Sequence, residues 1–113
     1  MHNRSMRAAA LVAVALLAVA CQHLGFQAET FNERLAVGYS TVTAARESAA
    51  SLLIAGKVSV EDARHVQAQA DNARAGLDVA RAIHAASPDA AEEKLTAILA
   101  GLEALSNYLR SRQ

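Results

Sequence analysis

Small and apolar residues recur at alternating steps of four and three between residues 31 and 109, and this spacing constrains the fold more than any other feature. Residues at such steps share one face of an α-helix, and a seam kept over about three heptads is typical of helices that pack lengthwise. No stretch shows the alternation of a β-strand, so the pattern predicts an all-α domain. The seam positions are Phe31, Leu35, Gly38, Val42, Ala45, Ala49, Leu52, Ala63, Val66, Ala70, Ala73, Leu77, Ala80, His84, Ala91, Leu95, Ile98, Leu102, Leu105 and Leu109.

Local start and stop signals divide this seam into three helices. Thr30 is followed three residues later by a glutamate, the spacing of a capping box, and Ser59 begins a similar signal. Gly56 suits the left-handed conformation that ends a helix. Ser87 is placed to cap the last helix, with Pro88 at the first position, where its missing N–H costs nothing. The predicted helices cover 31–54, 60–85 and 88–110.

The connections between these helices are short, so successive helices should be antiparallel neighbours. We therefore predict an antiparallel three-helix bundle over residues 30–113, with coiled-coil-like, alanine-rich packing. Gly38, Gly76 and Gly101 each cost about 1 kcal/mol relative to alanine within a helix. Close helix contact, inside the bundle or with another molecule, would explain them.

The segment before the bundle has the features of an export signal. Arg4 and Arg7 precede an uninterrupted apolar run of thirteen residues, Ala8 to Ala20, which ends directly before Cys21. Thirteen helical residues cover roughly 20 Å, too short for a hydrocarbon core of about 30 Å. The run therefore predicts targeting rather than a permanent transmembrane anchor.

The sequence Leu17-Ala18-Val19-Ala20-Cys21 resembles the lipobox of bacterial lipoprotein signals, although the usual leucine stands one place earlier. The resemblance covers residues 1–21. It implies cleavage between Ala20 and Cys21, a diacylglyceryl thioether on Cys21 and a fatty-acyl amide on the new N-terminus. Ordinary secretion would cut the same bond and leave a free thiol, which is a liability in an oxidising compartment.

The same resemblance places the mature protein in the cell envelope. Gln22, rather than aspartate, follows the cysteine, which implies delivery to the inner leaflet of the outer membrane, facing the periplasm. The predicted organisation is a signal peptide over 1–20, the lipidated cysteine and a tether over 21–29, and the bundle over 30–113. The membrane is then the first partner of the protein, through its lipid anchor.

Charge and residue pattern exclude several classes of function. Two of the eleven basic residues lie in the signal, so the mature part has nine against eleven acidic residues, a net charge of −2. This gives no basic field for nucleic acid. Glu61 and His65 have a metal-ligand spacing, but two surface ligands hold no metal firmly, and we expect an exposed ion pair. His84 should be a half-buried residue at a helix end. We predict no enzyme activity, no metal and no cofactor.

Two surface features remain as interaction sites. Asp71, Arg74, Asp78 and Arg81 form one charged stripe, which is either a docking strip for a partner or a solvated face with intrahelical ion pairs. Small residues on the last helix form a smooth patch beside its leucine seam, open either to packing in the bundle or to self-association: Ala97, Ala100 and Ala104.

The sequence thus predicts a lipid-anchored, non-catalytic interaction or structural module of the cell envelope. Its partner would be an envelope protein or another copy of the chain, contacted through helix faces. Two other readings remain open. One is a soluble secreted binding or inhibitor protein, and the other is a small lysis or stress lipoprotein of a mobile element.

Overall fold

The computed structural model describes residues 30–113, and the predicted signal and tether lie outside the described residues. Three helices make up this part of the chain: α2 (Phe31–Ile54), α3 (Val60–Ile83) and α4 (Pro88–Ser111). No strand occurs between residues 30 and 113. The α3 helix ends two residues before the predicted 85, and α4 ends one residue after the predicted 110. The predicted all-α class is confirmed for this domain.

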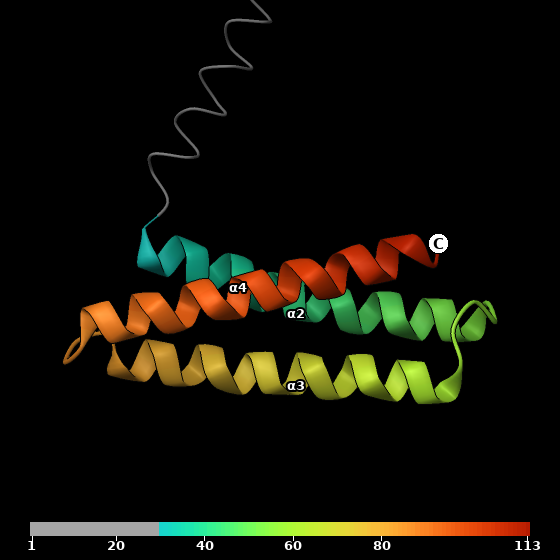
Figure 1. Cartoon of the computed structure of the whole chain (residues 1–113), viewed down its shortest axis with the longest axis horizontal. Coiled ribbons are helices and arrows are strands. Elements are labelled where there is room, and N and C mark those ends of the chain that lie inside the picture. Colours follow the sequence, from blue (N-terminus) through green and yellow to red (C-terminus); the bar gives the residue numbers. More distant parts are fainter. Residues whose placement is uncertain (1–29) are drawn as a thin grey trace, which may run out of the picture. The chain divides into compact units, whose positions relative to one another are not determined.

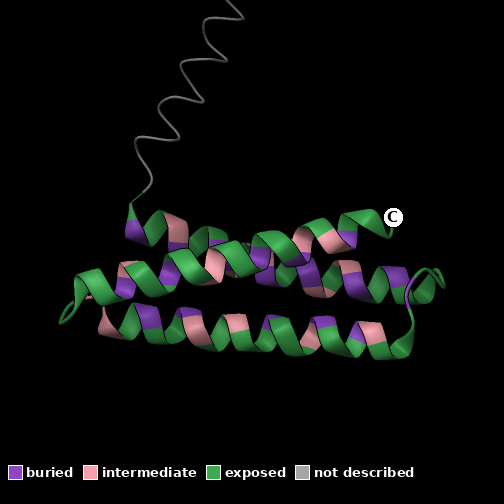
Figure 2. Ribbon diagram, viewed as in Figure 1, coloured by how far each residue is buried: buried purple, intermediate pink, exposed green. Residues whose placement is uncertain are grey.

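Each of the three helices packs against the other two. Figure 1 shows that the chain turns back at both connections, so that α3 returns beside α2 and α4 beside α3. Figure 2 shows the buried positions on the sides of the helices that face one another.

The buried core follows the predicted seam closely. All seven seam positions of α2 are buried, together with five of the seven in α3 and five of the six in α4. The three exceptions, Ala73, His84 and Ile98, are half-buried. Two leucines, Leu77 of α3 and Leu95 of α4, are completely enclosed. The sequence period therefore identifies which face of each helix enters the core.

The connection between α2 and α3 is built as its residues predict. Gly56 has a φ of +72°, its N–H donates to the carbonyl of Leu53 (3.0 Å), and the N–H of Lys57 donates to that of Leu52 (2.8 Å). These two bonds form a Schellman motif, which satisfies carbonyls at the end of α2. The hydroxyl of Ser59 then accepts a hydrogen bond from the N–H of Asp62 (3.0 Å) and caps α3.

The predicted side-chain cap at Ser87 is wrong. Pro88 does stand in the first turn of α4, but the Ser87 side chain makes no hydrogen bond to the helix. Its ψ is 71°, against 163° at the capping Ser59, so the two hydroxyls leave the backbone in different directions. The carbonyl of Ser87 accepts from the N–H of Ala91 (3.0 Å), just as the carbonyl of Ser59 accepts from the N–H of Ala63 (2.9 Å). Because proline has no N–H, α4 also begins with one fewer amide to satisfy.

Close helix contact explains two of the three helical glycines. A Cβ added at Gly38 would lie 2.8 Å from Cδ2 of Leu77, and one added at Gly76 would lie 2.7 Å from Cδ1 of Ile98. Both distances are shorter than packed carbon atoms adopt. A Cβ added at Gly101 would meet nothing within 4 Å. Packing within the bundle therefore gives no reason for a glycine at position 101.

Candidate functional site

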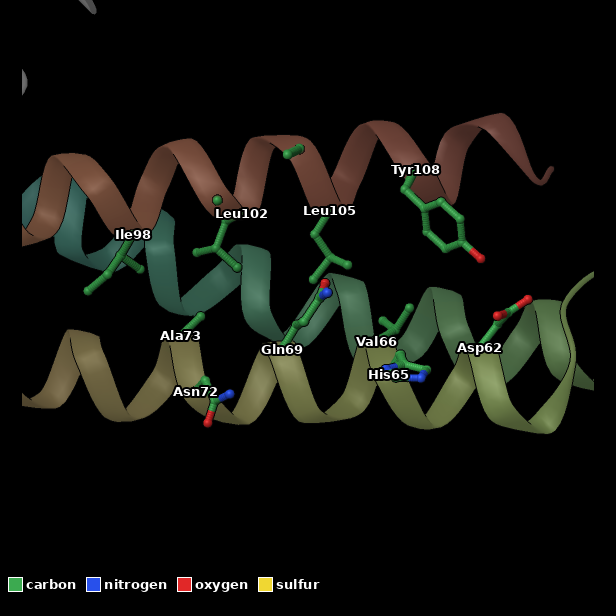
Figure 3. Close-up of a pocket in the computed structure, with 12 residues that line it drawn as sticks. Asp62, His65, Val66, Gln69, Asn72, Ala73, Ile98, Leu102, Leu105 and Tyr108 are labelled. Carbon is green, nitrogen blue, oxygen red and sulfur yellow. The ribbon is translucent and has the colours of Figure 1, made fainter.

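A groove with a volume of about 750 Å³ runs between α3 and α4. Figure 3 shows Ile98, Leu102 and Leu105 pointing from α4 toward α3, with Tyr108 at the end of the groove nearest Asp62. The floor of the groove consists of seam residues from the two helices. The next position outward on α4 is Gly101, which has no side chain to fill the space.

The two walls of this groove differ in chemistry. The α4 wall is aliphatic and small, and ends in an aromatic ring; the α3 wall is polar, with the side chains of Asp62, His65, Gln69 and Asn72. His65, which we predicted to pair with Glu61, lines the groove, and the two side chains form neither a hydrogen bond nor an ion pair. Between residues 30 and 113, no three His, Cys, Asp or Glu residues are grouped to hold a metal ion. The groove offers apolar contact and hydrogen bonds.

The charged stripe on α3 lies along the boundary with α2. Arg46 of α2 forms an ion pair with Asp71, and the hydroxyl of Tyr39 donates a hydrogen bond to Asp78. The guanidinium carbon of Arg81 lies 5.8 Å from the centroid of the Tyr39 ring, within cation–π range. All four residues are exposed, as expected for a solvated face, but between residues 30 and 113 no ion pair joins two members of the stripe, and α2 supplies the partners of Asp71 and Asp78. These contacts form because α2 packs closely enough for Arg46 and Tyr39 to reach the stripe.

These contacts occupy three of the four residues that we assigned to a docking strip. Within the described chain, Arg74 is the member of the strip that makes no such contact with α2. The strip is thus a charged edge of the α2–α3 contact, and binding of a partner there would have to compete with α2 or use Arg74. Docking at this strip stays a prediction.

Burial is the main reason why the pKa of Tyr39 is raised above its usual 10.0. The hydrogen bond to Asp78 adds to the rise, because it favours the protonated phenol, whereas the positive charge of Arg81 acts in the opposite direction. Tyr39 packs against the core, its hydroxyl is bonded to the carboxylate of Asp78, and the guanidinium of Arg81 lies over its ring.

We expect this tyrosine to make the stability of the bundle sensitive to alkaline pH. A folded-state pKa above the unfolded one stabilises the fold fully below pH 10, and the contribution is lost as the pH rises through the folded pKa. Urea denaturation between pH 8 and 11 should show a steeper fall for the native chain than for Tyr39→Phe. Equal slopes would mean that Tyr39 titrates normally. The difference in absorbance at 295 nm between the native chain and Tyr39→Phe provides an independent titration of this phenol, because Tyr108 is common to both.

Two further contacts join residues that are far apart in the sequence. Arg34 donates hydrogen bonds to Glu92 (2.6 Å) and to Thr96 (2.9 Å), which fastens α2 to α4. The rings of Phe31 and His84 stack at 3.9 Å and 10° at one end of the bundle. His84 is half-buried, as predicted, but the sequence analysis did not predict its stacking on Phe31. The signal that could have indicated this contact is that each residue is the terminal position of its seam. No sequence signal indicates the Arg34 contacts.

Cys21 and Ala20, the predicted lipidation and cleavage residues, lie outside the described residues. Within residues 30–113, the search for a helix long and apolar enough to span a membrane found none. Comparison of the chain with family models, with curated proteins and with solved structures found no match.

Proposed function

We propose that this chain is a lipid-anchored protein of the bacterial cell envelope, whose helical domain is a non-catalytic interaction module facing the periplasm. The single observation that carries the proposal is the apolar run that ends in Leu17-Ala18-Val19-Ala20-Cys21, followed by a folded domain from Phe31 onward. An acylated Cys21 would hold the domain at the membrane. Gln22 favours the inner leaflet of the outer membrane as its place.

The proposed mechanism is tethering. Each methylene of an acyl chain buried in the bilayer contributes about 0.8 kcal/mol, so that three chains would make the attachment effectively permanent. Residues 22–30 would extend to about 30 Å at most, which allows the domain to stand clear of the lipid headgroups. Confinement to a surface raises the effective concentration of the domain for partners in the same membrane.

For the domain itself we propose antiparallel, coiled-coil-like packing that holds three helix faces in a fixed relation. Support comes from the alternating seam, whose positions are buried in all three helices, and from the short connections. A rigid bundle with a groove on one side suits recognition of a helical partner. Its contacts provide apolar area and hydrogen bonds but no reacting group.

The intact mass of the protein purified from bacterial membranes tests the proposal. We expect a chain that begins at Cys21 and carries the mass of a diacylglyceryl group and a fatty-acyl amide. A chain that begins at an unmodified Cys21 would contradict lipidation and indicate ordinary secretion. A chain that keeps residues 1–20 would contradict both and indicate a signal anchor.

A further inference from the structure

The groove between α3 and α4 is open to a partner of matching shape. Its α4 wall is lined by Gly101 and Ala104, and its floor by Leu102 and Leu105. A glycine in the middle of a helix destabilises it relative to alanine. Because a Cβ at Gly101 would meet nothing in the bundle, no contact within residues 30–113 compensates for this destabilisation. A second helix packed against position 101 would compensate for the destabilisation.

The charges of α4 indicate which helix fits. One outward strip of this helix, here called the α4 strip, has acidic residues at its start, small residues at its centre, and a tyrosine and an arginine at its end. Arg112 belongs to the strip because its guanidinium carbon lies 5.3 Å from the centroid of the Tyr108 ring. All members are exposed except the half-buried Tyr108. The α4 strip consists of Asp89, Glu93, Ala97, Ala100, Gly101, Ala104, Tyr108 and Arg112.

We infer that a second copy of this chain docks on the α4 strip, which borders the groove through Gly101, Ala104 and Tyr108, with the two α4 helices antiparallel about a two-fold axis between Ala100 and Gly101. This register sets Asp89 of one copy opposite Arg112 of the other. Because a two-fold contact is self-complementary, the pair forms twice. The same register sets Glu93 opposite the Tyr108 hydroxyl and Ala97 opposite Ala104, with Gly101 at the point of closest approach.

Charge and helix dipoles both favour this occupant and this direction. A parallel pair of α4 helices would place Asp89 and Glu93 against their own copies, and Arg112 against Arg112. The antiparallel pair places opposite charges together at both ends and pairs the positive end of each helix dipole with the negative end of the other. The pairing goes beyond the proposed function, since it uses only the folded domain and does not depend on the anchor.

Directed cross-linking tests the pairing and its register. Full-length Cys21→Ser protein would be purified with either Ala97→Cys or Ala104→Cys added, and oxidised alone or as a mixture. We expect disulfide dimers in the mixture, where residue 97 meets residue 104, and little in either variant alone. Like positions would be seven residues apart, roughly 10 Å along the helices, beyond the reach of a disulfide.

Each outcome of this experiment decides the proposal. Ala50→Cys, exposed on α2, measures collisional cross-linking. A mixture that reacts no more than this control would overturn the pairing, and dimers in a single variant would overturn the antiparallel register. The Cys21→Ser background removes the only native thiol, so the result is independent of lipidation. Failure of the pairing can thus be distinguished from failure of the anchor.

A charge exchange provides a second test that misfolding cannot imitate. Asp89→Arg or Arg112→Asp alone should weaken dimerisation in sedimentation equilibrium by about tenfold, because two attractive pairs become repulsive. The double variant should recover it. Helix-end effects of the two changes would add rather than cancel, so recovery cannot come from stability. Glu103→Arg, exposed on another side of α4, should leave the dissociation constant unchanged. A double variant as weak as the single ones would contradict the contact.

Discussion

Leu77→Asp is expected to abolish the folded bundle. Leu77 is 0% exposed, and both of its methyl groups lie against the backbone position of Gly38. A carboxylate there would be buried without a partner, which costs several kcal/mol in proteins. A domain of this size is stable by only about 4–12 kcal/mol, at roughly 0.05–0.15 kcal/mol per residue. Far-UV circular dichroism should show most of the helix signal lost at 25 °C.

Val79→Asp is the matched control for this experiment. It places the same carboxylate two residues further along α3, at a position that is 47% exposed. Substitutions at such positions usually change the free energy of unfolding by less than about 0.5 kcal/mol. The control should therefore keep its helicity and its cooperative denaturation. If Leu77→Asp also denatured like the native chain, the seam on α3 would not face the core.

The second large effect is expected for Cys21→Ser, which should release the protein from the membrane. The proposed anchor depends on one sulfur atom, because the thioether is the first modification that the lipoprotein resemblance implies. Without it, the attachment described above disappears, and no helix between residues 30 and 113 can replace it. Because Ala18-Val19-Ala20 also fits the cleavage site of ordinary secretion, fractionation should move the protein from the detergent-extracted membrane to the soluble fraction.

Gln22→Ser is the control, because it changes the neighbouring residue and leaves the cysteine in place. This variant should stay in the membrane and carry the same acyl mass as the native chain. A native protein that is already soluble would contradict the anchor and favour a secreted binding protein. A native protein that is toxic when overexpressed, with toxicity lost in Cys21→Ser, would favour the lysis lipoprotein reading.

The proposed anchor and the proposed α4 pairing would both favour association of two copies. Two copies on one membrane meet at a far higher local concentration than two copies in solution. A contact of modest affinity is then sufficient, which fits a strip with a small, smooth centre and only one charged pair at each end. The α4 strip and the anchor would therefore act together to dimerise the domain at the membrane.

The local structure of this bundle was predictable from the sequence because it depends on neighbouring residues. The four–three seam predicted the buried face of each helix, and the left-handed turn at Gly56 and the cap at Ser59 were read from single residues in their immediate context. Ser87 shows the limit of such reasoning. The same residue type at the same kind of position makes no cap, because the chain enters α4 with a different backbone angle.

Only the tertiary structure decided which faces of the helices meet and which stay open. Each helix has a particular rotation about its axis, and no local sequence pattern encodes that angle. These rotations allow the ion pairs between Arg46 and Asp71 and between Arg34 and Glu92 to form. The same rotations separate Gly38 and Gly76, which are closed by neighbouring side chains, from Gly101, which faces a groove. The sequence by itself determined the helices and their buried stripes, since consecutive residues carry that information, and the targeting signal stays a prediction from the same kind of local pattern. The packing of three helices determined the surface that is left for a partner.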